Sequence, residues 1–166
     1  MQRIIFISIL FMLAISLVAC TLFDSNQAVY VRNISSTYLG SVEIAGLQLG
    51  TNINGIDFTS FTATERNILW FDYLFEEVGF IVDADENLTT IQGWISSGAT
   101  FEINGMTFDT LMQITEELGG HHNDYWFDRE QSMRAVTYAD MQSGVSLTAV
   151  YFDFNDELVW VILTYM

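Results

Sequence analysis

The second half of the chain contains runs rich in aromatic and β-branched residues, separated by short turn sequences. These runs are Tyr125–Phe127, Met133–Ala139, Val145–Phe152 and Leu158–Tyr165. Such runs are typical of β-strands, and short turns join neighbouring strands in antiparallel order. The pattern therefore predicts an antiparallel sheet, which constrains this half of the chain to a β-rich fold.

One segment before these strands has helical periodicity instead. Its apolar or semi-polar positions recur at spacings of three and four residues: Phe108, Leu111, Met112, Thr115 and Leu118. Such spacing lines one face of a helix. Thr107 is expected to be the N-cap, and Gly119-Gly120 is expected to end the helix. The sequence thus predicts one amphipathic helix at about residues 107–118, and the fold class is α+β with antiparallel sheets.

The first half of the chain has shorter and more broken patterns. Strands are predicted at Val42–Ala45, Ile68–Phe75, Val78–Val82 and Leu88–Ile95, with an acidic turn before the last of them. A short strand around Ile53 and one helical turn at residues 62–67 are also expected. Together these segments predict an antiparallel meander.

Several stretches of the two halves are alike. Residues 53–58 (INGIDF) parallel residues 103–108 (INGMTF), and the turn at 82–88 parallels the turn at 152–158. A rival alignment pairs residues 43–46 (EIAG) with residues 102–105 (EING), so the register of the comparison stays open. We expect a degenerate two-unit repeat, with a first antiparallel β unit at 29–98 and a second α+β unit at 99–166.

The second unit has the order I-x-G-(M/I)-T-F, amphipathic helix, L-G, loop, and three antiparallel strands with an acidic turn before the last. Over residues 101–166 this order is similar to the tandem helix-plus-sheet modules of the beta-lactamase-inhibitor-protein-like and SmpA/OmlA superfamily. The resemblance implies a small secreted or lipid-anchored protein that binds other proteins and is not an enzyme. It implies a class of function, and no individual residue is carried over from it.

The N-terminus predicts export. Arg3 is followed by an uncharged apolar run, Ile4–Val18, which is shorter than the roughly 20 residues of a membrane-spanning helix. The run ends in Leu17-Val18-Ala19-Cys20, which resembles the lipobox of bacterial lipoproteins. An ordinary secretory signal and an uncleaved anchor helix are the alternatives.

The lipobox resemblance implies a signal peptide at residues 1–19 and a lipidated Cys20, followed by a tether to residue 28. The lipids implied are a thioether-linked diacylglycerol and a fatty acid such as palmitate. The protein is then expected on the extracytoplasmic face of a cell membrane in the envelope, and on the outer membrane if the host has one. Cys20 is the only cysteine, so no intramolecular disulfide can stabilise the fold.

The chain is strongly acidic, with a net charge of −16 and no lysine among its cationic residues. Nucleic-acid binding is disfavoured because it requires a basic surface. A basic protein or peptide is the favoured partner, and solubility or adaptation to a saline habitat is the alternative explanation of the charge. The absence of lysine excludes a Schiff base and a P-loop.

One loop offers candidate metal ligands. His121, His122 and Asp124 are near neighbours, and Asp128 follows shortly after. Imidazole and carboxylate groups bind divalent ions. Adjacent histidines rarely ligate one ion together, however, so a solvated loop is the alternative. No cofactor is expected.

Aromatic residues offer candidate partner-binding positions, namely Tyr125, Trp126, Trp70 and Tyr73. They could form an exposed stacking surface for a protein or a sugar, or pack in the core. No nucleophile, zinc or phosphate-loop motif is present. The expected function is a membrane-anchored, non-catalytic protein-binding or envelope-maintenance module. The alternatives are a metal- or cation-binding lipoprotein using the 121–128 loop, and a cell-wall hydrolase.

Overall fold

The aromatic and β-branched runs of the second half form four consecutive antiparallel strands, as predicted. They are β7 (Asn123–Asp128), β8 (Met133–Asp140), β9 (Val145–Phe152) and β10 (Leu158–Tyr165). The first half adds β2 (Tyr73–Leu74), β3 (Val78–Val82) and β4 (Leu88–Trp94). All of these strands belong to one seven-stranded sheet in the order β2-β3-β4-β10-β9-β8-β7.

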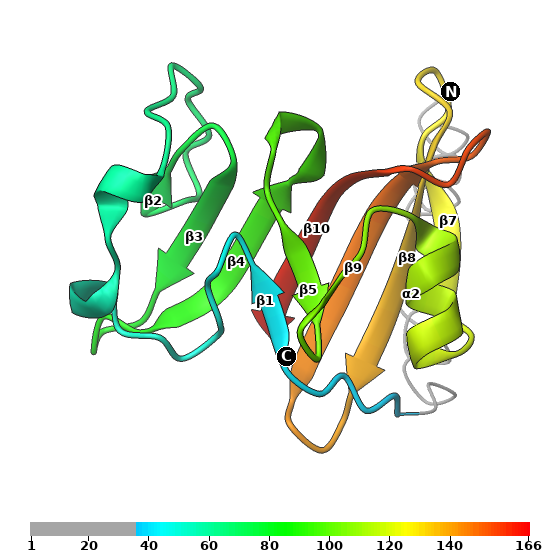
Figure 1. The fold of residues 1–166 in the computed structure, drawn as a ribbon, viewed down its shortest axis with the longest axis horizontal. Coiled ribbons are helices and arrows are strands. Elements are labelled where there is room, and N and C mark those ends of the chain that lie inside the picture. Colours follow the sequence, from blue (N-terminus) through cyan, green and yellow to red (C-terminus); the bar gives the residue numbers. More distant parts are fainter. Residues whose placement is uncertain (1–35) are drawn as a thin grey trace, which may run out of the picture. The chain divides into compact units, whose positions relative to one another are not determined.

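This computed structural model describes residues 36–166, which form one unit (Figure 1). The predictions for Cys20, the signal peptide at 1–19 and the tether at 20–28 fall outside the described residues. Within residues 36–166, no helix is long and apolar enough to cross a membrane.

A second, three-stranded sheet consists of β1 (Val42–Ile44), β5 (Phe101–Ile103) and β6 (Met106–Thr107), in the order β1-β5-β6. Together with helix α2 (Leu111–Leu118) it lies over one face of the large sheet (Figure 1). We call the covered face the inner face and the opposite face the outer face. Two antiparallel sheets and one helix make the fold α+β, which confirms the predicted class.

The core lies between the inner face and the elements that cover it. Its fully buried side chains come from both sheets and the helix, and include Ile44, Phe80, Ile91, Phe101, Ile103, Ile114, Tyr138 and Leu147. At Gly93 on β4 the two sheets approach most tightly. A Cβ there would overlap Cγ2 of Ile44 on β1, so this strand position has no room for a side chain.

The predicted helix is confirmed, but its predicted start at Thr107 is wrong. Thr107 pairs with Glu102 in the small sheet, and α2 begins only at Leu111. Thr110 is the N-cap: its hydroxyl accepts from the Gln113 amide, while the Gln113 side chain accepts from the Thr110 amide. This reciprocal capping box satisfies backbone N–H groups at the start of the helix. A helix that began earlier would have no such cap. The helix ends at Gly119, as predicted.

The first half departs further from expectation. Of the predicted strand at 68–75, only Tyr73–Leu74 pairs. The segment around Ile53 is a 3-10 turn, η1 (Ile53–Gly55), and not a strand. The helical turn expected at 62–67 is absent, and a 3-10 turn instead occupies η2 (Phe58–Ser60). The side chains of Asn52 and Asp57 accept hydrogen bonds from the turns that follow them, and such local bonds compete with strand pairing.

Strands from either side of the predicted boundary at residues 96–98 share both sheets. The short 3-10 helix η3 (Ile95–Ser97) lies at that position. On one side of the core β4 pairs with β10, with Gln92 opposite Ile162. On the other side β1 pairs with β5, with Glu43 opposite Glu102. Strands from before and after residues 96–98 therefore pair with each other and join residues 36–166 into one structure.

Candidate functional site

Aromatic side chains are arranged in a row across the outer face of the large sheet. Trp94 on β4 lies directly opposite Trp160 on β10. The ring of Phe127 contacts Trp160 edge-on with centroids 5.1 Å apart. In the other direction Phe71 contacts Trp94 at 5.9 Å, and Trp70 contacts Phe71 at 6.2 Å. We call these five residues, Trp70, Phe71, Trp94, Phe127 and Trp160, the aromatic belt.

Strand alternation places the belt on the outer face. Gly93 and Val161 pair with each other and meet Ile44 in the core, so they lie on the inner side. Their neighbours Trp94 and Trp160 must then point outward. Phe71 reaches the same face from the loop before β2, where its ring lies 3.0 Å from the position a Cβ of Gly79 would take.

One cross-strand row of the sheet passes through the centre of the belt, at Trp160 and Trp94. From β7 inward, the residues opposite one another are Tyr125, Ala135, Val150, Trp160 and Trp94. The two small residues in the middle of this row, Ala135 and Val150, are fully buried and pack with Met133 and Trp160. The large rings thus cover the small side chains, and this packing holds the belt in place.

The ends of the belt are exposed and its centre is half-buried. Trp70 is 70% exposed and Phe127 is 48% exposed. The guanidinium of Arg66 stacks 5.0 Å from the Trp94 ring and is held by Glu76 at 3.1 Å. This cation–π contact places one charge on the belt, and an acidic side chain already pairs with it.

The structure brings only some of the predicted partner-binding residues together. Trp70 is part of the belt, and Tyr125 is exposed on the same outer face as Phe127. Tyr73 instead lies inward, where it stacks on Phe80 and Phe58 at 5.0 and 5.4 Å. Trp126 faces the inner side of β7.

Two central residues of the belt, Trp94 and Trp160, were absent from the sequence-based candidates. Residues 158–163 are all apolar and residues 88–94 do not alternate regularly, so no period-two pattern marked either tryptophan as outward-facing. The local sequence also could not show that the two strands are paired.

Arg134 organises the surface around Trp126. Its guanidinium binds the Asp124 carboxylate through two nitrogens, at 3.0 and 2.8 Å. It also lies 3.5 Å from Asp153 and 5.1 Å from the centre of the Trp126 ring. The hydrogen bond to Asp124 raises the pKa of Arg134. A second guanidinium, that of Arg129, lies 5.8 Å from the same ring, so Trp126 is flanked by two cations.

The candidate metal ligands are engaged in other contacts. His121 lies 3.7 Å from Asp124, but that carboxylate is bound by Arg134. Nε2 of His122 lies 2.6 Å from the Thr37 hydroxyl. Asp128 accepts from the backbone amides of the turn after β7. In the described part of the chain, no three histidine, cysteine, aspartate or glutamate residues are grouped as metal ligands.

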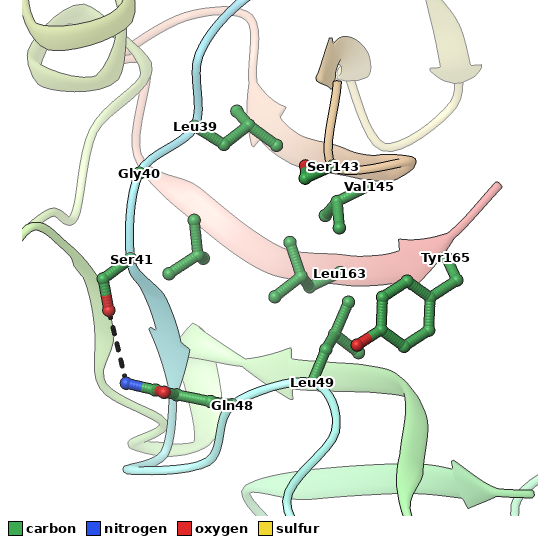
Figure 2. Close-up of a pocket in the computed structure, with 10 residues that line it drawn as sticks. Leu39, Gly40, Ser41, Gln48, Leu49, Ser143, Val145, Leu163 and Tyr165 are labelled. Atoms are coloured by element: carbon green, nitrogen blue, oxygen red, sulfur yellow. Dashed lines mark hydrogen bonds between the residues drawn. The ribbon is translucent and has the colours of Figure 1, made fainter. Parts of the chain in front are cut away.

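A groove of about 260 Å³ lies at one end of the core (Figure 2). Its apolar lining comes from Leu39, Val42, Leu49, Val145 and Leu163. Hydroxyl and amide groups edge it, and Gln48 donates to the Ser41 hydroxyl at 3.3 Å. Among residues 36–166, neither a carboxylate nor an imidazole lines the groove, so these residues place no acid–base pair in it.

No protein-family model matches this chain, and no curated protein or solved structure is detectably similar to it. The resemblance to the SmpA/OmlA superfamily therefore stays a prediction from the sequence. The candidate site is defined by geometry alone, and its main feature is the aromatic belt.

Proposed function

We propose that this protein is a lipid-anchored lipoprotein of the extracytoplasmic membrane face that acts as a non-catalytic binding module. The observation that carries the proposal is the aromatic belt, two groups of contacting rings on the outer face of the sheet that meet at the paired residues Trp94 and Trp160. Soluble monomers rarely expose contiguous apolar surface without a use for it. Tryptophan is also enriched among the residues that contribute most to protein–protein binding.

The charge of the chain supports a basic partner. The protein has a net charge of −16, and Arg66, the cation on the belt, is already paired with Glu76. Association with a second acidic surface would be opposed by repulsion, whereas a basic protein would be attracted and oriented. The rings would then provide the short-range contacts of the complex.

The anchor part of the proposal comes from the lipobox-like sequence that ends in Cys20. Two acyl chains attach a protein durably to a membrane, whereas one does so only marginally. Such an anchor would keep the acidic domain at the membrane surface. It suits a module that binds envelope proteins.

The non-catalytic part of the proposal is supported by the chemistry of the groove. Ser41, Ser143 and Tyr165 bring hydroxyl groups to it. A nucleophilic hydroxyl needs an adjacent base, and none of the described residues that line the groove carries an imidazole or a carboxylate. The cell-wall hydrolase alternative would require a pair of carboxylates at such a site.

We also propose that the chain is a degenerate two-unit repeat, in the register that pairs residues 43–46 with 102–105. Supporting this register, Ala45-Gly46 after β1 and Asn104-Gly105 after β5 all have positive φ, at 51°, 74°, 53° and 77°. The other register, which pairs residues 53–58 with 103–108, has less support, because residues 53–55 form a 3-10 turn whereas Ile103 ends a strand. The acidic turns also match, with φ of 63° at Glu86 and 59° at Asp156.

The binding proposal can be tested with three forms of the full chain: wild type, a double variant Trp70→Ala/Phe127→Ala, and Tyr38→Ala. Tyr38 is an exposed aromatic residue outside the belt, so Tyr38→Ala is the matched control. Each form is crosslinked through its carboxylates to proteins in detergent-solubilised host membranes, because the chain has no lysine. Captured proteins are identified by mass spectrometry.

We expect wild type and Tyr38→Ala to enrich the same basic protein, and the belt variant to lose it. Capture should also fall at high salt, since exposed charges are screened. Equal capture by the belt variant would contradict the role of the belt. If wild type itself enriches no protein, the binding-module proposal is wrong.

A further inference from the structure

The two edges of the seven-stranded sheet differ in whether further chain segments cover them. Beyond β2, Ala63 forms a bridge with Phe75, and the Glu76 amide donates to the Thr62 carbonyl at 2.9 Å. The Thr62 side chain also bonds Glu77. At the opposite edge, β7 pairs with β8, and within residues 36–166 no strand pairs with its other side. One edge is thus covered, and the other is open.

Strand β7 has only part of the protection that is usual at an open edge. Common protective features are short length, bulges, charged side chains and proline. β7 carries Asp124 and Asp128 and has one register shift, but the chain contains neither lysine nor proline. The register shift in β7 comes only between Trp126 and Asp128, so residues 123–126 pair regularly with β8. Tyr125 and Trp126 are 43% and 39% exposed, and aromatic residues favour strand pairing.

We infer that the open edge of β7 binds an extended basic segment of a partner protein, which adds to the sheet as an eighth strand. The inference rests on the proposed function and specifies how binding occurs. In strand addition, the main chain provides hydrogen bonds and alternate side chains provide specificity. The two faces of β7 therefore determine which side chains such a segment must carry.

On the outer face, the added strand would lie beside Tyr125 and the Phe127 end of the belt. Both rings are exposed on that face. Apolar side chains at alternate positions of the partner would cover them. The same strand would thereby extend the apolar surface of the belt.

Around the inner side of β7, the added strand would meet more acidic than basic groups. Asp124 lies on this side, opposite Val136, and Glu130 is exposed in the turn that follows β7. Asp153 lies 3.5 Å from Arg134. These three carboxylates outnumber the two guanidinium groups, of Arg129 and Arg134, that flank Trp126. Basic side chains at the intervening positions of the partner would pair with the excess of negative charge.

A second copy of the chain is a poorer occupant of the same edge. Each copy has a net charge of −16, so association of two copies is opposed by repulsion. Antiparallel self-pairing centred on Trp126 would also place Asp124 of one copy opposite Asp128 of the other. Like charges directly opposite each other destabilise strand pairs.

The test uses the full chain in detergent micelles and a capped synthetic peptide of alternating valine and lysine. One control peptide has the same composition in two blocks, and another alternates valine with glutamate. Peptide affinity is measured by fluorescence anisotropy, and backbone hydrogen exchange is followed across residues 123–128. Glu130→Lys is compared with Glu65→Lys, which makes the same charge change at an exposed site in the loop before the covered β2 edge.

We expect the alternating valine–lysine peptide to bind and to slow exchange in residues 123–128, but not in residues 73–74. Glu130→Lys should weaken binding at least about fivefold, and Glu65→Lys should weaken it less, because nearby charges contribute most. Both control peptides should leave exchange unchanged.

Three results would overturn the inference. Peptide binding without slower exchange in 123–128 would mean docking on side chains alone, which leaves the binding-module proposal standing. Exchange that is already slow in the chain by itself would mean that the edge is occupied by another part of the chain, or by a second copy if the protection depends on concentration. No peptide binding would also reject strand addition, and the belt variants would still test the proposed function separately.

Discussion

Trp94 and Trp160 lie directly opposite each other on β4 and β10, although 65 residues separate them in the sequence. Their strands come from different halves of the chain and meet at the middle of the sheet. Phe127 and Phe71 extend the row from this pair in both directions. The aromatic belt therefore depends on the β4–β10 pairing, and the stability of that pairing can be tested through it.

Substitution Trp160→Ala should destabilise the protein because it uncovers buried Val150 and removes the contact between Phe127 and the centre of the belt. We expect a loss of about 2–3 kcal/mol in the free energy of unfolding, since the ring is only half-buried. Chemical denaturation would measure it. Tyr38→Ala is the control and should change the value little. An unchanged stability in Trp160→Ala would show that the ring does not pack on the sheet.

Substitution Gly93→Ala should destabilise the interface between the two sheets. The added methyl would overlap Ile44 on β1, and overpacking of a core costs about 1–3 kcal/mol. The loss should shrink in an Ile44→Ala background, which a double-mutant cycle would detect. Gly79→Ala is the matched control, because its methyl would meet the half-buried Phe71 ring, which can shift. Equal losses at both glycines would argue against a tight approach at Gly93.

Substitution Arg134→Lys should loosen the surface around Trp126. A lysine cannot reproduce the two-nitrogen contact with Asp124 or the planar stacking on the ring. We expect a loss of about 1 kcal/mol and altered tryptophan fluorescence, because the ion pair is partly exposed. Arg129→Lys, whose guanidinium is farther from the ring, should have a smaller effect. The reverse order would mean that Arg129 is the more important of the two cations.

The stability should fall when the pH is lowered through the range in which histidine titrates. Burial, reinforced by the charge of His121, lowers the pKa of His122. Its ring faces His121, the Thr37 hydroxyl and the edge of Tyr138. The unfolded chain therefore binds the proton more readily. The contribution is complete above the ordinary histidine pKa of about 6.5 and is lost as the pH falls through the folded-state value.

Thermal unfolding of wild type and His122→Gln between about pH 7.5 and pH 5 would test this expectation, because the window brackets the histidine pKa. The midpoint should fall more steeply in wild type. Hydrogen bonds from Ser143 and Gln142 lower the pKa of Asp140, so its contribution is lost only in more acidic solution and should be the same in both proteins. Parallel curves throughout would show that His122 does not cause the pH dependence.

Substitution Cys20→Ser should abolish lipid attachment, because the chain contains no other thiol. We expect wild type to incorporate labelled palmitate and to sediment with membranes, and the variant to do neither. A wild-type protein that is cleaved and released without lipid would support the ordinary secretory signal instead. Uncleaved wild-type protein that stays in the membrane without label would support the anchor helix.

The strands of the second half could be predicted from the sequence because their information is local. Val145–Phe152 and Leu158–Tyr165 match β9 and β10 residue for residue. The helix start was predicted too early because Thr107 and Thr110 are both acceptable caps, and only pairing of Thr107 with Glu102 removes the first of them. The run at 68–75 is as apolar as a strand, but Leu69 and Trp70 lie exposed in a loop.

The amino-acid sequence by itself determined the lipobox-like N-terminus, the acidic charge, the α+β class and the positions of the long strands in the second half. It could not determine which face of the sheet would be covered. A period of two shows which side chains share a face, whereas burial depends on what packs there. Only the tertiary structure placed β1, β5 and α2 over one face and left Trp94 and Trp160 on the other. The reason is that the belt arises from pairing between strands distant in the chain, and local sequence does not specify such pairing.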